Sequence, residues 1–226
     1  MKLDGIFKNY NLISAEIPNQ ADIIKHLKGF VRQQQIYNAA IKEVRTKLEI
    51  LDDEFKVRYD HNPIHHMEYR LKSPESIYQK LKKRNLDINL ESIRNNLTDI
   101  AGVRLICNYI EDIYRIADLL VSQDDIKLLK RRDYIANPKS NGYRSLHLIV
   151  EVPIFLAQST EQIPVEVQIR TIAMDFWASL EHQLKYKANN EVPTQLHCRL
   201  KACAEQIAEL DLEMQSIHDE IKTSKI

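Results

Sequence analysis

The side chains best suited to chemistry lie on a predicted strand, Pro164–Arg170, with the sequence PVEVQIR. Its apolar residues alternate with an acid, an amide and a base, so the three polar side chains share one face of the strand. They are Glu166, Gln168 and Arg170. An acid, an amide and a base in one row can bind a metal ion, a hydroxyl group and a phosphate together. The same alternation is typical of a half-exposed strand on a solvated sheet, and the pattern alone leaves both interpretations open.

A second carboxylate, Asp99, comes just before another predicted strand, in the segment LTDIAGVR. Metal-dependent phosphoryl transfer needs oxygen ligands that converge on a Mg²⁺ ion, which also holds the phosphates. Asp99 and Glu166 can converge only if their two strands are neighbours in the sheet. Taken alone, Asp99 is equally suited to capping a turn. The other acidic clusters, Asp52–Glu54 and Asp211–Glu213, fall in predicted helices, where we expect them to face solvent.

Basic side chains that can bind phosphate are concentrated in the middle of the chain. Residues 70–144 hold 15 Lys and Arg against 10 Asp and Glu, although the whole chain is neutral, with 32 of each sign. A basic centre in a neutral protein favours a local anion site, with ordinary solvated faces as the alternative. The four glycines form neither GxxxxGK[ST] nor GxGxxG, which excludes P-loop and Rossmann chemistry. The candidate phosphate ligands are therefore the helix start at Ser73–Ser76 and the side chains of Arg70, Lys72, Lys80, Lys83, Arg104, Lys130, Arg131 and Arg144.

Several residues could recognise a purine base. The turn at Asn141–Ser145 exposes Tyr143 at the mouth of a predicted strand, where it can either stack on a base or cover the sheet edge. The guanidinium groups of Arg70 and Arg104 can also stack on a purine. Asp175 can accept two hydrogen bonds from guanine N1–H and N2–H, although Asp is also common in the first turn of a helix.

The elements that position these residues follow from hydrophobic periodicity. Apolar stripes predict a long N-terminal helix over Asp22–Tyr59 and a second long helix that contains Leu196 to Ile221, which needs a partner from the N-terminal helix or from another subunit. Between them, the predicted strands are 102–109, 127–134, 143–152 and 164–170, and the predicted helices are 76–84, 90–97, 112–122 and 171–186. We therefore expect an α+β fold, a mixed β-sheet flanked by helices with long N- and C-terminal helices.

Composition excludes other classes of protein. The longest apolar stretch, Leu146–Ala157, is short of the roughly 18 continuous apolar residues of a membrane helix, and the N-terminus lacks the features of a signal peptide. We expect a soluble protein of a reducing cytosol, with its three cysteines as small core residues. They are Cys107, Cys198 and Cys203. His61 and His65 are spaced like zinc ligands on a helix, but the intervening Pro63 disfavours that helix.

Five segments together resemble the small alarmone synthetases, which are single-domain relatives of the synthetase half of the Rel/Spo-homologue stringent-response enzymes. They are RLKSPESI (70–77), DIAGVR (99–104), RDYI (132–135), NGYRSLH (141–147) and VEVQIRT (165–171). The resemblance runs from about residue 35 to 215 in motif order. It implies a nucleotidyltransferase-like fold and transfer of the β,γ-pyrophosphate of ATP to the 3′-hydroxyl of GDP or GTP, giving ppGpp or pppGpp and AMP.

The resemblance also implies a role for each matching residue. It implies Mg²⁺ as the cofactor, held by Asp99 and Glu166, with Glu166 also acting as general base on the 3′-hydroxyl. The implied ATP-binding residues are Arg70, Lys72, Ser76, Lys80, Lys83 and Arg104. The implied GDP- or GTP-binding residues are Lys130, Tyr143, Arg144, His147, Gln168, Arg170 and Asp175.

The resemblance further implies how the chain is organised. Residues 1–35 are an N-terminal extension, residues 36–190 are the synthetase domain with its leading helix, and residues 191–226 are a C-terminal oligomerisation helix. A cytoplasmic homotetramer assembled through the terminal helices is implied, without membrane contact, and single-stranded RNA or the alarmone are candidate regulators. The sequence leaves the choice between GDP and GTP open. A nucleotidyltransferase with another acceptor and a non-catalytic RNA- or nucleotide-binding module are the alternatives.

Overall fold

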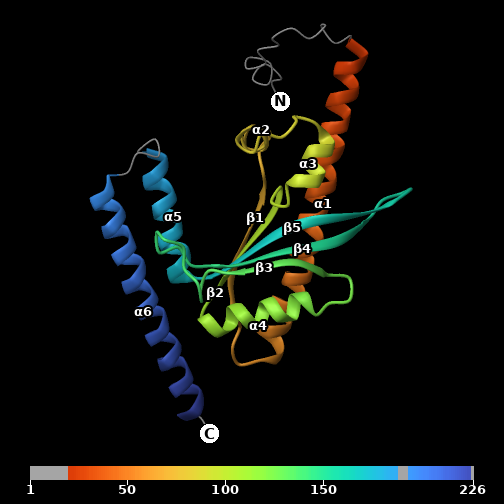
Figure 1. The fold of residues 1–226 in the computed structure, drawn as a ribbon. Helices are drawn as coiled ribbons and strands as arrows, with labels where there is room; N and C mark the ends of the chain where they lie inside the picture. The colour runs from red at the N-terminus through yellow and green to blue at the C-terminus, as the bar shows by residue number, and fades with distance from the viewer. Residues whose placement is uncertain (1–19, 188–192, 225–226) are drawn as a thin grey trace.

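The computed structural model of the 226-residue chain describes residues 20–187 and 193–224. Figure 1 shows a twisted sheet with helices around it and a long helix toward each end of the chain. The helices are α1 (Gln20–Arg58), α2 (Pro74–Lys83), α3 (Leu90–Asn96), α4 (Ile110–Val121), α5 (Ile172–Lys187) and α6 (Thr194–Ser224). The strands are β1 (Ile64–Leu71), β2 (Ala101–Cys107), β3 (Lys127–Asp133), β4 (Leu146–Phe155) and β5 (Thr160–Thr171). The predicted α+β fold with long terminal helices is confirmed.

The five strands form one mixed sheet in the order β1-β2-β5-β4-β3. Strands β2 and β5 pair in parallel, and the other three pairs are antiparallel. The central position of the parallel pair has a direct consequence for the site. The strand that Asp99 precedes and the strand that carries Glu166 are neighbours, which is the condition that the sequence left open.

The register of the strands separates an apolar face from a polar face, because residues paired across neighbouring strands point to the same side of the sheet. On the apolar face, Val167 of β5 lies between Val103 of β2 and Leu148 of β4, and all three are buried. On the polar face, two rows cross the sheet. They are Arg70–Gly102–Glu166 and Glu68–Arg104–Gln168–His147.

Helix α1 packs along the apolar face and builds the main core with it. The apolar stripe predicted from the sequence is the buried side of this helix, and it includes Tyr37, Val44, Leu48 and Phe55. Burial of each such side chain contributes about 1.5–3 kcal/mol. Helix α4 adds further residues to the same core, so the polar face is left for the site. Helix α1 runs without a break through residue 35, the predicted end of the N-terminal extension; residues 1–19 and the boundary at 190–191 lie outside the described residues.

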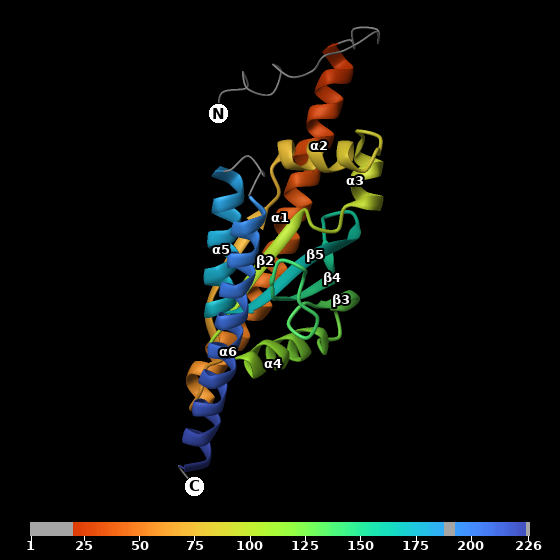
Figure 2. The ribbon, with the colours of Figure 1, turned by 60° about the vertical axis from the view of Figure 1, so that its left-hand side comes forward.

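Helix α6 lies side by side with α5 in both views (Figures 1 and 2), and it also contacts α4. The indole Nε1 of Trp177 on α5 donates a hydrogen bond to the carbonyl of Leu200 at 2.9 Å. Farther along α6, the His218 ring stacks on Tyr109 with ring centroids 4.0 Å apart. Among the described residues, the C-terminal helix therefore packs on α5 and α4 more than on the N-terminal helix.

Some predictions from the sequence are wrong. Strand β1 was not predicted, although its Met67, Tyr69 and Leu71 alternate with the polar Glu68 and Arg70. Strand β4 begins three residues later than predicted, since the preceding segment forms a turn with Gly142 at a φ of +90°.

Over the described residues, no helix is both long and apolar enough to cross a membrane.

Two further errors concern the side chains of α6. Cys107 is buried as predicted, but Cys198 and Cys203 are exposed, because they lie on sides of α6 that the rest of the chain does not cover. Asp211 was expected to face solvent and is buried instead, since its turn of α6 lies against the end of β5.

Candidate active site

A cluster of opposite charges lies where β1, α2 and the start of β2 meet. Asp99 Oδ2 accepts hydrogen bonds from Lys72, which follows β1, and from Lys80 on α2 at 2.5 Å. Burial alone would raise the pKa of Asp99, but the hydrogen bonds from the two lysines outweigh it and hold this pKa below its usual value. Burial also lowers the pKa of Lys72, more than Asp99 raises it. We call Lys72, Lys80 and Asp99, with the adjacent Arg70 and Arg104, the lysine cluster.

The lysine cluster opens into a pocket of about 250 Å³ on the polar face of the sheet. The pocket is lined by Glu68, Tyr69, Arg70, Lys72, Asp99, Gly102, Val103, Arg104, Glu166 and Gln168. Gly102 lies between Arg70 and Glu166 in its row and has no side chain to fill the pocket floor. Six residues predicted for the site from three separate motifs thus share one cavity.

Glu166 lies at the centre of the polar face and is held from two sides. Gln168 Nε2 donates to Glu166 Oε2 at 2.9 Å, and His147 Nδ1 lies 3.4 Å from Glu166 Oε1. Burial acts to raise the pKa of Glu166, but the hydrogen bonds from His147 and Gln168 outweigh it, so this pKa is lowered. Burial lowers the pKa of His147. At neutral pH Glu166 is therefore an ionised carboxylate beside a neutral imidazole, which is the deprotonated form that a general base requires.

Gln168 links Glu166 to the buried Arg170, which organises a hydrogen-bond network. Its guanidinium donates to Tyr143 OH at 2.6 Å, to Gln168 Oε1 at 2.8 Å and to Asp175 Oδ1 at 3.0 Å. Its Nε also donates to Ser145 Oγ at 3.3 Å, and Tyr143 OH lies 2.8 Å from His147 Nε2. We call these residues the Arg170 network. Because Arg170 donates these four hydrogen bonds to side chains of the protein, its role is to fix the side chains around it.

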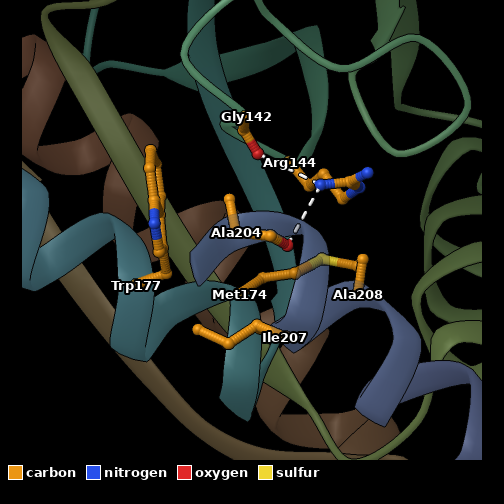
Figure 3. A pocket seen from close by; sticks show the side chains of 7 residues that line it. All are labelled: Gly142, Arg144, Met174, Trp177, Ala204, Ile207 and Ala208. Carbon is orange, nitrogen blue, oxygen red and sulfur yellow. Dashed lines mark hydrogen bonds between the residues drawn. The ribbon is translucent and has the colours of Figure 1, made fainter. Parts of the chain in front are cut away.

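The remaining candidate residues lie apart from the pocket. Arg144 points toward α6, where its Nη1 lies 3.3 Å from the carbonyls of Gly142 and Ala204 (Figure 3). Ser76 is in the first turn of α2, with its hydroxyl 2.9 Å from that of the N-cap Ser73. Lys83 is exposed in the last turn of α2. Lys130 is exposed on the edge strand β3, in register with Ile149, which pairs with Glu166.

One residue of the site, Glu68, was missed by sequence reasoning. Glu68 accepts a hydrogen bond from Arg104 Nη1 at 2.8 Å, and the alternation within the unpredicted strand β1 could have placed it on the face of Arg70. Ser145 is fully buried and links Arg170 to the carbonyl of Ile169. The burial of Ser145 depends on tertiary packing, and no local pattern distinguishes a buried serine from an exposed one.

The two carboxylates fit a divalent cation. Asp99 Oδ1 is buried without a hydrogen-bond partner among the described residues. The charge of Asp99 acts to raise the pKa of Glu166, so the two groups are within electrostatic reach of each other. No cluster of three or more His, Cys, Asp or Glu side chains in the described part of the chain could hold a metal by itself. Two carboxylates that leave the other positions to water and phosphate oxygens are a typical protein contribution to a Mg²⁺ site.

A mixed sheet that carries two acidic side chains beside lysines and arginines on one open face defines an α+β enzyme of the nucleotide-transferring class. Comparison with known proteins agrees with this class. Residues 69–191 match the family described as "Region found in RelA / SpoT proteins". The GTP pyrophosphokinase YwaC of Bacillus subtilis is 42% identical over 205 residues, which cover 91% of this chain and 98% of that protein.

Solved structures are similar over nearly their whole length. The small alarmone synthetase 1 from Bacillus subtilis bound to its product pppGpp has a TM-score of 0.81 at 35% identity, covering 86% of this chain and 99% of that chain. The same synthetase bound to AMPCPP has a TM-score of 0.75 at 32% identity, covering 87% and 99%. The chain therefore belongs to the RelA/SpoT family, and within it to the small alarmone synthetases.

Proposed function

We propose that this chain is a (p)ppGpp synthetase, which transfers the β,γ-pyrophosphate of ATP to the 3′-hydroxyl of GDP or GTP. The observation that carries the proposal is the meeting of Asp99 and Glu166 across the parallel pair β2–β5, at one pocket with Arg70, Lys72 and Arg104. The 3′-oxygen attacks the β-phosphorus of ATP, the bond from the β-phosphorus to the bridging oxygen of AMP breaks, and AMP leaves. In such a transfer, positioning and charge neutralisation supply most of the catalysis.

The lysine cluster is the ATP side of the site. Arg70 and Arg104 project from neighbouring strands on one face, which allows their guanidinium planes to hold adenine between them. Lys72 and Lys80 neutralise the phosphates, with Ser76 and Lys83 farther along α2. In the free protein, the carboxylate of Asp99 is the negative partner of Lys72 and Lys80. When ATP binds, its phosphates become the negative partners of the two lysines.

The Arg170 network is the acceptor side. Tyr143 stacks on guanine, and its hydroxyl is already fixed by Arg170. Asp175 accepts from the guanine edge with Oδ2, which Arg170 does not contact and to which Ser179 Oγ donates at 3.5 Å. Arg144, His147, Gln168 and Lys130 help to orient the nucleotide. Glu166 lies between both sides and takes the proton of the 3′-hydroxyl. Asp99 and Glu166 would hold Mg²⁺, which would supply positive charge against the phosphates.

The first test is product formation. The purified chain is incubated with Mg²⁺, γ-³²P-labelled ATP and either GDP or GTP, and the products are separated by thin-layer chromatography. We expect labelled guanosine tetra- or pentaphosphate, and loss of about 10²–10⁴-fold in rate for Glu166→Gln, the usual contribution of a general base. Glu151→Gln is the matched control, because Glu151 lies on the same face of the sheet outside the pocket.

Each other outcome points to one alternative. A labelled product that forms without dependence on GDP or GTP indicates a transferase with another acceptor. Binding of nucleotide or RNA without any product indicates a non-catalytic binding module. A rate that is unchanged in Glu166→Gln contradicts the assigned base.

The assembly belongs to the same proposal. Four apolar residues of α5 at intervals of four remain 43–59% exposed. They are Ile172, Phe176, Leu180 and Leu184. Together with exposed apolar residues of α6 such as Met214 and Ile217, they form the surface through which the terminal helices of four copies assemble. The cytoplasm holds both nucleotide substrates and is the expected location, and single-stranded RNA or the alarmone is the expected regulator.

Light scattering after size exclusion tests the assembly. Phe176→Glu places a charge in the α5 stripe and should reduce the mass of the particle. Phe155→Glu, on a phenylalanine of β4 that is 80% exposed against 59% for Phe176, should leave the mass unchanged. A tetramer that withstands Phe176→Glu would exclude the α5 stripe as the interface.

A further inference from the structure

Asp211 on α6 is a buried carboxylate to which the proposed reaction gives no role. Only 7% of Asp211 is exposed, and its Oδ2 accepts a hydrogen bond from Thr171 Oγ1 at 2.5 Å. Burial raises the pKa of Asp211 in spite of this hydrogen bond and of the nearby positive charge of Arg144. Burying a carboxylate is costly, and Asp211 is 40 residues from its partner in sequence. The contact therefore calls for an explanation.

Thr171 is the point where the strand of the site becomes a helix. It is the last residue of β5 and is fully buried, and its Oγ1 also accepts a hydrogen bond from the backbone N–H of Met174 in the first turn of α5. Arg170 precedes it, and Asp175 follows one turn later. Their side chains form an ion pair of 3.0 Å across this junction. Asp211 thus fixes the strand-to-helix junction from which both ends of this ion pair project.

Helix α6 supports the Tyr143 turn as well. Arg144 Nη1 reaches the carbonyl of Ala204 at 3.3 Å, as Figure 3 shows. Gly142 packs so closely on α6 that an added Cβ would lie 2.6 Å from Ala204 Cβ. The space left between these residues and Trp177 is about 10 Å³, enough for no more than about one water molecule. This contact is therefore packing and not a second ligand site.

We infer that Asp211 is a positioning residue for the acceptor nucleotide, acting through Thr171 on the Arg170 network. The inference rests on the proposed assignment of that network to GDP or GTP. It gives α6 a second role besides assembly, because one helix supports both the β5–α5 junction and the turn that carries Tyr143. Among the described residues, the lysine cluster has no hydrogen bond to α6, and it approaches the junction at Arg104 Nη1, 3.7 Å from Asp175 Oδ1; the ATP side should therefore depend on Asp211 much less than the acceptor side does.

The test is to measure the KM for GDP and the KM for ATP separately in variants of the 226-residue chain. Asp211→Ala and Thr171→Val should each raise the KM for GDP at least about tenfold, since a 1 Å misplacement can cost about 10²-fold. The KM for ATP should stay within about twofold of the wild-type value. The double variant should show no further loss, because both changes remove the same contact. Asp211→Asn keeps an acceptor oxygen and should restore most of the affinity for GDP.

Controls separate this inference from its premise and from misfolding. Glu213→Ala removes an exposed carboxylate from the same helix and should change neither KM. If Asp211→Ala does not fold, Asp211→Asn and Thr171→Val carry the test. Equal increases of both KM values, or an unchanged KM for GDP, would overturn the inference. Tyr143→Ala is measured in parallel: if it leaves the KM for GDP unchanged, the acceptor assignment fails, and if it alone raises this KM, only the role of Asp211 fails.

Discussion

The lysine cluster and the Arg170 network meet where Arg104 Nη1 lies 3.7 Å from Asp175 Oδ1, and they differ in how their polar groups are satisfied. In the lysine cluster, Asp99 Oδ1 and Arg104 Nε are buried without partners among the described residues. In the Arg170 network, the guanidinium makes four hydrogen bonds to four different side chains. Unpaired buried polar atoms are costly, and they are tolerated where a ligand satisfies them. One side is therefore prepared for incoming charge, whereas the other is already organised as a rigid surface.

This difference predicts whether a substitution reduces catalysis alone or stability as well. A residue of the lysine cluster contributes its interactions when the ligand is bound, so its loss should reduce catalysis more than stability. A residue of the Arg170 network contributes in the free protein, so its loss should reduce both. The following predictions test this division.

The largest effect is expected for Asp99→Asn. Loss of one of two carboxylates at the pocket should lower kcat by about 10²–10³-fold, the usual size for one preorganised charged or polar group. Lys72 and Lys80 remain, so binding of a non-hydrolysable ATP analogue without Mg²⁺ should persist. Calorimetric titration with and without Mg²⁺ measures both. If Mg²⁺ improves binding of the analogue equally in the variant and in the wild type, Asp99 is not a metal ligand.

Arg170→Lys should reduce stability as well as activity. A lysine keeps the charge but cannot make the divergent hydrogen bonds of the guanidinium to Tyr143, Gln168 and Asp175. We expect a loss of about 2–3 kcal/mol in the free energy of unfolding, or about 4–12 °C in Tm for a chain of this size. Thermal unfolding followed by circular dichroism measures it. A variant with wild-type Tm and a raised KM for GDP would show that Arg170 contacts the nucleotide directly and does not organise the network.

The same division explains which features the sequence could predict. Alternation along residues 164–170 placed Glu166 and Gln168 on one face, and the structure has them there, because side-chain direction in a strand is a local property. The meeting of Asp99 with Glu166 depends on the order of the strands, which no single segment carries. The family resemblance supplied that information, and the residues alone left it open.

Contacts made by helix packing were beyond local reasoning. Asp211 belongs to an acidic, helical segment, and its burial depends on where α6 docks against the end of β5. Arg144 lies in a motif with residues of the site, yet its side chain turns toward α6. In both cases the deciding partner is at least 40 residues away, and helical periodicity does not specify which side of α6 meets it.

Two substitutions at Tyr143 separate its ring from its hydroxyl. Tyr143→Ala removes the stacking surface and should weaken binding of GDP by about 1–3 kcal/mol, the usual value of a base–aromatic stack. Tyr143→Phe keeps the ring and loses the hydroxyl contacts to Arg170 and His147, so it should cost less affinity and mainly lower the Tm. Equilibrium binding of GDP and thermal unfolding are measured for both. Equal losses of affinity in the two variants would assign the effect to the hydroxyl and contradict stacking.

The smallest effect is a change in the pH dependence of stability, which should come from the lysine cluster. The pKa of Asp99 in the folded protein lies below its usual value of 3.8 because Lys72 and Lys80 donate to the ionised carboxylate. A carboxyl group with a lowered pKa stabilises the fold above its unfolded-state pKa, and this contribution disappears as the pH falls through the folded-state pKa. Urea unfolding of the wild type at pH 7, 5, 4 and 3 should therefore show a steeper loss below about pH 4 than unfolding of Asp99→Asn. Glu213→Gln, which removes an exposed carboxylate of α6, is the control for the loss of one negative charge and should follow the wild type. An identical pH profile for wild type and Asp99→Asn would mean that the two lysines do not stabilise the ionised carboxylate in solution.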